Sequence, residues 1–224
     1  MVESLRVPSV SGDPISARLR ILSLTGGGYR GLFTAAVVAK LEQRIAPARL
    51  CDRFDVFAGT SIGGLLACGL AIGVPAATLL STLKEHGPKV FAPKTALGIR
   101  RLFATPYTAQ PLAEAIRACL GVWADKPISD VERGLLVTAI NWVEGAPVVF
   151  RNQALGAAGA SRETLLDVCL ATAAAPTFFP PHVIGKAPMI DGGLIANNPD
   201  CIALIETLKR WPEAMPRISI RTYP

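Results

Sequence analysis

The stretch Phe-Ala-Gly-Thr-Ser-Ile-Gly-Gly at residues 57–64 holds a Gly-x-Ser-x-Gly motif between a strand-like and a helix-like pattern. Without a Cβ atom, Gly59 and Gly63 allow the chain to turn tightly around an exposed Ser61 hydroxyl. The preceding residues 54–58 are typical of a short buried strand. The motif is also typical of a small-residue turn before a buried helix, so both interpretations stay open at this point.

Strand and helix patterns alternate through the rest of the chain. This alternation predicts an α/β sandwich with a mainly parallel sheet. The predicted strands are 18–25, 54–58, 135–140, 146–150 and a short one at 189–190. The predicted helices are 31–45, one from Ser61 to a break near Gly73, 108–120, 162–174 with Ser161 as its cap, and 199–209.

The composition indicates a globular protein with a large core. Half of the 224 residues are hydrophobic and 18% are charged, which fits one domain rather than a disordered chain. The net charge of +6 is compatible with an anionic membrane surface or a phosphorylated ligand. It is too weak and dispersed to favour binding of a nucleic-acid polymer.

Cysteine and histidine usage favours a reduced, cytoplasmic protein without a metal site. The five cysteines contain no Cys-x-x-Cys pair, and neither histidine has a second ligand at useful spacing. The start of the chain does not resemble a signal peptide. Residues 56–83 carry no charge and are long enough to span a bilayer. However, five Gly residues and one Pro interrupt this stretch. A buried strand and helix explain this stretch better than a membrane span.

A serine nucleophile needs a base, and the sequence favours a carboxylate over a histidine. No histidine follows Asp191, whereas the α/β-hydrolase order places histidine last. Asp191-Gly-Gly follows an apolar segment, so this carboxylate could lie against the serine at the end of a strand. A common Asp-Gly-Gly hairpin turn explains the same residues equally well.

The glycine loop after the first strand admits two functions. The amides of Gly26, Gly27 and Gly28 can converge on an oxyanion at the start of a helix, and Arg30 can orient the loop or meet an anionic group. The loop also matches the Gly-x-Gly-x-x-Gly dinucleotide fingerprint, which would make the protein a nucleotide-binding oxidoreductase. That fingerprint requires an acid at the end of the second strand, where Gly59-Thr-Ser stands instead.

Together, the three motifs in this order resemble the patatin-like phospholipase family. Residues 173–181 also resemble the segment that precedes the aspartate in that family, and the likeness spans residues 18–208. It implies a three-layer α/β/α sandwich in which Ser61 is the nucleophile and Asp191 the base of a Ser-Asp dyad. Gly26, Gly27, Gly28 and Arg30 would form the oxyanion hole. The substrate would be a lipid acyl ester, and no metal or cofactor would be needed.

Residues 21–33 and 54–61 look like bacterial members of this family. Some of those are anti-phage effectors that cyclic oligonucleotides switch on to degrade the cell's own membrane. The likeness therefore implies a cytoplasmic phospholipase that meets the membrane peripherally, with a cyclic oligonucleotide as candidate activator. A non-catalytic lipid-binding module is the alternative from another class.

One departure concerns the last residues. Family members continue past the last helix with a strand and a Gly-Thr-Gly-like turn, whereas this sequence reads Arg217-Ile-Ser-Ile-Arg-Thr-Tyr-Pro. We expect one patatin-like domain over residues 1–224, shortened at its C-terminal end.

The stretch from Lys84 to Tyr107 is the least regular in pattern and has a local excess of positive charge. Aromatic residues alternate with the basic ones, which suggests contact with anionic lipid. A solvated surface loop is the alternative. The residues that carry this hypothesis are Lys84, Lys89, Phe91, Lys94, Arg100, Arg101, Leu102, Phe103 and Tyr107.

Overall fold

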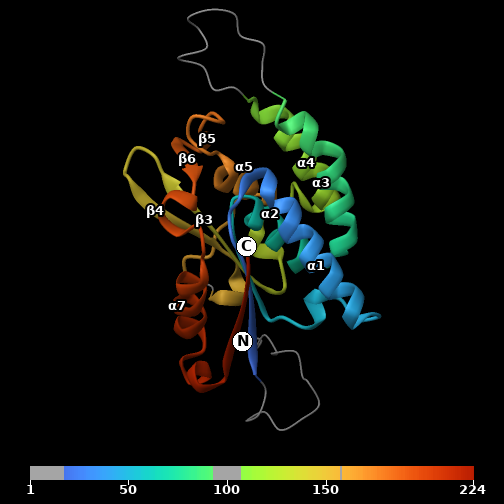
Figure 1. Cartoon of the computed structure of the whole chain (residues 1–224). Helices are drawn as coiled ribbons and strands as arrows, with labels where there is room; N and C mark the ends of the chain where they lie inside the picture. Colours follow the sequence, from blue (N-terminus) through green and yellow to red (C-terminus); the bar gives the residue numbers. More distant parts are fainter. Residues whose placement is uncertain (1–17, 93–106, 157) are drawn as a thin grey trace, which may run out of the picture.

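The structure, a computed structural model, describes residues 18–92, 107–156 and 158–224. Its centre is a sheet with the strand order β5-β6-β3-β2-β1-β7, and β4 also pairs with β3 (Figure 1). The strands are β1 (Leu19–Leu24), β2 (Val56–Thr60), β3 (Gly134–Asn141), β4 (Ala146–Arg151), β5 (His182–Ile184), β6 (Ala187–Asp191) and β7 (Ile218–Tyr223).

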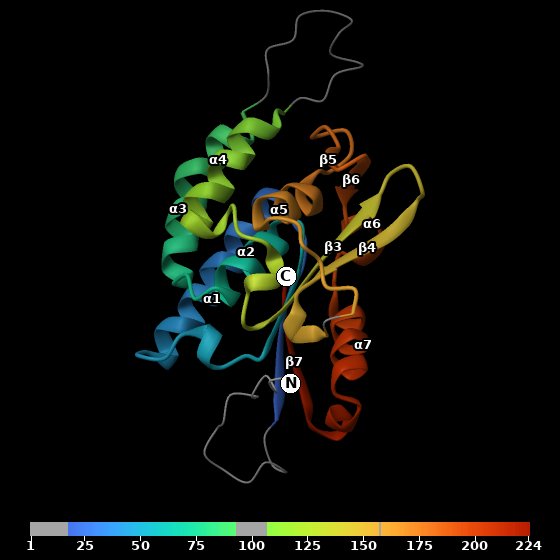
Figure 2. The same cartoon turned by 180° about the vertical axis from the view of Figure 1, so that it is seen from behind.

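Four neighbouring strands, β7, β1, β2 and β3, run parallel, whereas β4, β5 and β6 add antiparallel pairs. Helices cover both faces, so the predicted three-layer α/β/α architecture is confirmed. Figures 1 and 2 show α1 to α5 on one side of the sheet and α7 on the other. The helices are α1 (Gly31–Ile45), α2 (Ile62–Ala71), α3 (Ala76–Val90), α4 (Ala109–Leu120), α5 (Leu165–Ala173), α6 (Gly193–Ala196) and α7 (Asp200–Arg210).

The two faces of the sheet bury alternate residues of its central strands. In β2, Phe57 packs in the larger core under α1 to α5, while Val56 and Ala58 belong to the smaller core with Ala203 of α7. This alternation follows from the period of two in a strand. Because both faces are covered, β2 and β3 are buried at every position.

The structure adds one helix to those predicted and corrects another. Helix α3, which the sequence did not predict, reaches Val90 in a stretch that looked irregular, because buried residues at helical spacing join it to the core. Helix α5 begins at Leu165, since the Thr164 hydroxyl accepts a hydrogen bond from Asp167 N at 3.0 Å. Ser161, the predicted cap, instead accepts a hydrogen bond from Arg151 N through its hydroxyl.

Other predicted elements agree closely with the structure. Helix α1 covers the predicted residues 31–45, and the predicted strands near residues 135–140 and 146–150 form the β3–β4 hairpin. At the other end of the sequence, β7 adds a parallel strand beside β1. The backbone N–H of Thr25 donates to Tyr223 O at 3.0 Å, so the end of β7 lies beside the start of the glycine loop.

Candidate active site

Ser61 lies on a strained turn between β2 and α2. Its φ of 56° and ψ of −128° are unusual for a residue with a side chain. A Cβ on Gly59 would be 2.2 Å from Gly63 O, and one on Gly63 would be 2.3 Å from Leu24 O. The two glycines therefore permit the close backbone approach that the motif predicted, and they leave Ser61 at the tip of the turn.

A buried threonine fixes the backbone of this turn. The hydroxyl of Thr172 in α5 accepts a hydrogen bond from Ser61 N–H at 2.7 Å and donates to Thr138 O at 2.7 Å. The neighbouring Thr60 hydroxyl lies 2.7 Å from both the Thr138 hydroxyl and Ala196 O. Helix α5, strand β3 and helix α6 thus hold the turn from three sides.

Strand register brings Asp191 to Ser61. Strand β2 runs along β3 until Thr60 lies opposite Thr138, and β6 runs the other way until Asp191 lies opposite Ala139. Since β4 takes the other edge of β3, β2 and β6 meet end to end on the same edge. The serine that follows Thr60 and the aspartate that ends β6 are therefore neighbours.

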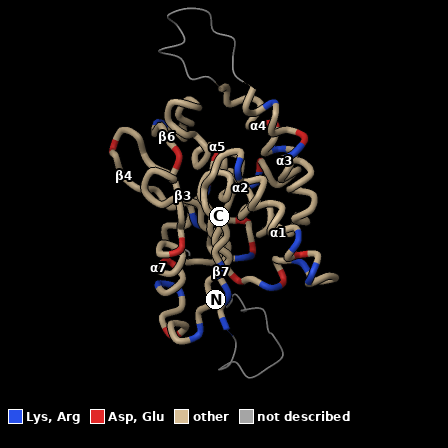
Figure 3. Tube along the Cα trace, viewed as in Figure 1, with Lys and Arg blue, Asp and Glu red and all other residues tan. Residues whose placement is uncertain are grey.

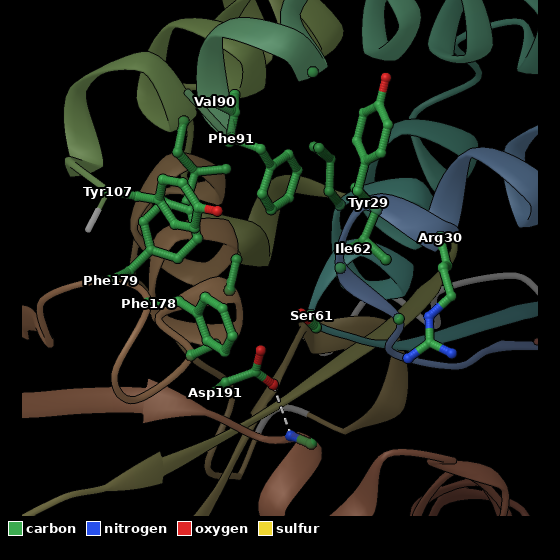
Figure 4. Close-up of a pocket in the computed structure, with 18 of the residues that line it drawn as sticks. Tyr29, Arg30, Ser61, Ile62, Val90, Phe91, Tyr107, Phe178, Phe179 and Asp191 are labelled. Atoms are coloured by element: carbon green, nitrogen blue, oxygen red, sulfur yellow. Dashed lines mark hydrogen bonds between the residues drawn. The ribbon is translucent and has the colours of Figure 1, made fainter. Parts of the chain in front are cut away.

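Asp191 is buried, with 7% of its surface exposed, and its carboxyl group lies beside the Ser61 side chain. Its Oδ1 also accepts Gly193 N–H at 2.7 Å (Figure 4). Burial raises the pKa of the Asp191 carboxyl, because the charged form loses water, while the neighbouring Ser61 hydroxyl and the hydrogen bond from Gly193 N–H oppose this shift. A raised pKa strengthens the carboxylate as a proton acceptor.

The glycine loop lies against the same serine, but its three amides differ in whether they already have a hydrogen-bond partner and whether they line the cavity. Gly26 N–H donates to Asn197 O at 3.0 Å, so this amide is already engaged. Gly27, Gly28 and Arg30 line a cavity together with Ser61 and Asp191. In the view of Figure 4, Arg30 and Asp191 lie on opposite sides of Ser61. The loop leads directly into the N-terminus of α1, where the helix dipole favours negative charge.

The cavity has a volume of about 710 Å³, and its walls are mainly apolar. Beyond Ser61 it extends between α2, α3, α4 and α5. The buried residues that line it there are Leu65, Leu83, Leu112, Ala115, Ile116 and Cys169. This shape and lining suit an extended apolar group whose polar end remains at the serine.

Aromatic side chains form the upper wall of this cavity (Figure 4). The Phe91 ring lies 5.3 Å from that of Tyr29 and 5.7 Å from that of Tyr107, and Tyr107 lies 5.4 Å from Phe179. Phe91 and Tyr107 thus line the cavity, although the sequence suggested that they contact lipid at the surface. Lys84 and Lys89 are exposed on α3. The remaining residues of that hypothesis, from Lys94 to Phe103, lie outside the described residues.

The sequence analysis missed Thr172 and Asn197. Both are distant in sequence from the residues that they contact, Ser61 and Gly26, and the fold brings them together. The motifs themselves converge as expected, and His182, set aside as a base, pairs with Asp167 at 2.9 Å. No acid ends β2, where a dinucleotide site would require one, because Thr60 stands there. The fold and site therefore define an α/β protein with a serine on a strand-to-helix turn and a buried aspartate beside it.

The chain belongs to the patatin-like phospholipase family, because the model of that family matches residues 22–200. It is 37% identical to a cGAMP-activated phospholipase of Escherichia coli, over 86% of this chain and 56% of that protein. The corresponding protein of Vibrio cholerae is 35% identical, over 93% and 63%. A cUMP-AMP-activated phospholipase of Escherichia coli is 30% identical, over 84% and 58%. The chain thus spans little more than half the length of these relatives.

Proposed function

We propose that this protein is a serine acyl hydrolase that cleaves fatty-acyl esters of membrane phospholipids. The observation that carries this proposal is the pairing of Ser61 with buried Asp191 at the wall of an apolar cavity. Family membership and the names of the relatives support the same reaction class. The whole described chain would act as one patatin-like catalytic domain.

In the proposed reaction, Ser61 Oγ attacks the ester carbonyl while its proton passes to Asp191. The carbonyl oxygen becomes an oxyanion, which the amides of Gly27 and Gly28 and the α1 dipole stabilise. The tetrahedral intermediate then breaks its bond to the alcohol oxygen, and Asp191 returns the proton to this leaving group. An acyl-enzyme on Ser61 and a lysophospholipid result.

Hydrolysis of the acyl-enzyme repeats these steps with water. Asp191 takes a proton from the water as it attacks the acyl carbonyl, and the ester bond to Ser61 breaks. The proton then returns to Ser61 Oγ, and the fatty acid is released. Removal of an oxyanion donor typically costs about 3 kcal/mol of transition-state stabilisation, so the loop geometry is as important as the dyad.

The same proposal places the protein at the membrane only peripherally, in the cytoplasm. No helix within residues 18–92, 107–156 and 158–224 is both long and apolar enough to cross a bilayer. The relatives named as activated by cGAMP or cUMP-AMP support a cyclic dinucleotide as activator. Activity assays should therefore be run with and without such a nucleotide.

Covalent labelling with a fluorophosphonate probe tests the proposal. We expect labelling at Ser61, its complete loss in Ser61→Ala, and a decrease of about a hundredfold or more in Asp191→Asn. Ser23→Ala is the matched control, because this second serine is also buried but does not line the cavity. Absence of labelling with and without cGAMP, or labelling that survives in Ser61→Ala, would contradict the proposed function.

A further inference from the structure

The exposed apolar side chains of this protein gather around the mouth of the active-site cavity. Among the described residues, eleven large apolar side chains are exposed. Three of these lie elsewhere, namely Val122, Ile205 and Met215. The other eight, which we call the apolar rim, are Tyr29, Phe33, Trp142, Val143, Phe178, Val183, Leu194 and Ile195.

The topology explains why the rim forms one surface. The parallel strands β1, β2 and β3 all end at the edge of the sheet where Ser61 lies. Trp142 and Val143 directly follow β3, and Trp142 N–H donates to Pro188 O at 2.9 Å. Pro188 in turn lies opposite Val183 in the β5–β6 hairpin. These three rim residues therefore belong to the same edge of the sheet as the nucleophile.

The rest of the rim is continuous with the cavity. Tyr29, Phe178 and Leu194 are both exposed and part of the cavity wall. Ile195 follows Leu194 in α6, and Phe33 lies one helical turn beyond Tyr29. An apolar path thus leads from exposed side chains into the cavity. Soluble proteins rarely expose so many large apolar residues in one region without a partner.

We propose that the apolar rim is a docking surface for an anionic phospholipid bilayer, so that the cavity opens directly into the lipid. This inference rests on the proposed function, since it assigns the face through which the lipid substrate arrives. Trp142 suits the boundary between headgroups and acyl chains, where tryptophan is enriched. Phe33, Leu194 and Ile195 provide apolar area that would enter the acyl region.

The charges near the rim complement an anionic surface. Arg30 lies between Tyr29 and Phe33, Lys186 occupies the turn between β5 and β6, and Lys89 precedes the cavity residue Val90. All three are exposed, and the exposed acid Glu144 lies beside Val143. Figure 3 shows where basic and acidic residues lie along the Cα trace. The positive excess would draw anionic headgroups towards the rim.

Vesicle sedimentation tests the docking surface. The Ser61→Ala chain, which cannot digest the lipid, is mixed with vesicles of phosphatidylcholine and phosphatidylglycerol in equal parts. Combining Trp142→Asp, Val143→Asp and Ile195→Asp should weaken binding by about tenfold or more, because binding strength follows the apolar area buried. The control combines Val122→Asp, Ile205→Asp and Met215→Asp, and it should bind as the parent chain does. Vesicles of phosphatidylcholine alone should bind the parent chain more weakly.

A second readout uses the fluorescence of Trp142 in the otherwise unchanged Ser61→Ala chain. Brominated phospholipids should quench part of the emission, and Trp142→Phe should abolish that part. No quenching, or equal loss of sedimentation in the rim and control variants, would overturn the docking surface. The result is separate from the proposed chemistry, because fluorophosphonate labelling of the rim variants on an active Ser61 background reports the dyad alone.

Discussion

The Ser61 backbone N–H donates to the Thr172 hydroxyl at 2.7 Å, which ties the turn before α2 to helix α5. The same hydroxyl donates to Thr138 O, so its hydrogen position is fixed. Ser61 keeps a backbone conformation of positive φ that an unsupported serine would leave. Thr172 is therefore a positioning residue, which acts on the nucleophile without touching substrate.

Replacement of Thr172 by Val should impair both stability and the reactivity of Ser61. The variant removes the acceptor of the buried Ser61 N–H and one donor to Thr138 O, and a buried group left without a partner costs about 1–3 kcal/mol. We expect a lower melting temperature and slower fluorophosphonate labelling at Ser61. Thr172→Ser, which keeps the hydroxyl, should retain most of both. Equal labelling rates in Thr172→Val and Thr172→Ser would exclude a positioning role.

The rate of the reaction at Ser61 should increase as the pH rises through the pKa of Asp191. Burial raises this pKa above the ordinary value of 3.8, and only the ionised carboxylate can accept the Ser61 proton. The labelling rate should therefore fall on acidification through the raised pKa, at a pH above that of an ordinary aspartate. A rate that depends on pH only at or below 3.8 would contradict this assignment.

The same shift predicts a cost in stability at neutral pH. Because the folded state binds the Asp191 proton more tightly than the unfolded state, stability falls as pH rises from the unfolded pKa through the folded one. Asp191→Asn removes this charge and keeps an acceptor for Gly193 N–H. Its melting temperature should exceed that of the wild type at pH 7, and the difference should shrink on acidification. A difference independent of pH would contradict the linkage.

The turn at Ser61 should tolerate no side chain at Gly63. A Cβ there would lie 2.3 Å from Leu24 O and 2.5 Å from Thr25 O, and neither backbone oxygen can move without displacing β1. We expect Gly63→Ala to lower the melting temperature strongly and to abolish labelling. Gly27→Ala is the control for folding, because its nearest neighbour would be 3.7 Å away. Similar melting curves for both variants would refute the packing argument.

The motifs were predictable from sequence because each carries a local signal. Gly59 and Gly63 mark the turn, and Asp191 ends an apolar segment, so a strand-to-helix turn at Ser61 and a carboxylate at the end of a strand could be predicted. The order of the strands in the sheet was not predicted. Thr172 could not be found in this way, since a threonine in an alanine-rich helix has no distinctive pattern. Its role arises only when α5 packs against β2 and β3.

Contacts between distant segments also explain the remaining differences between the sequence predictions and the structure. The Gly26 amide was expected to serve the oxyanion, but Asn197 O, far along the chain, accepts it. The rings of Phe91 and Tyr107 alternate with charges in sequence, which suggested a surface role. In the fold they meet Tyr29 and Phe179 at the cavity wall. Local pattern does not contain such pairings, because tertiary packing selects the side of each ring.

The depth of the cavity should set the length of the acyl chain that the enzyme accepts. Ala115 of α4 is buried and forms part of the deep wall, beyond the serine. A phenylalanine at this position would fill space that a long acyl chain needs, while a short chain would still reach Ser61. We therefore expect Ala115→Phe to reduce kcat/KM for p-nitrophenyl palmitate by about tenfold or more, with little change for the butyrate.

Ala118→Phe provides the matched control, because Ala118 lies on the same helix but is exposed. It should leave the ratio of palmitate to butyrate hydrolysis unchanged, and melting curves of both variants show whether the fold is retained. If Ala115→Phe lowers both esters equally in a folded protein, the acyl chain does not lie between α2, α3, α4 and α5. If only palmitate hydrolysis falls, the acyl chain occupies this cavity, and the cavity wall at Ala115 limits the length of the acyl chain.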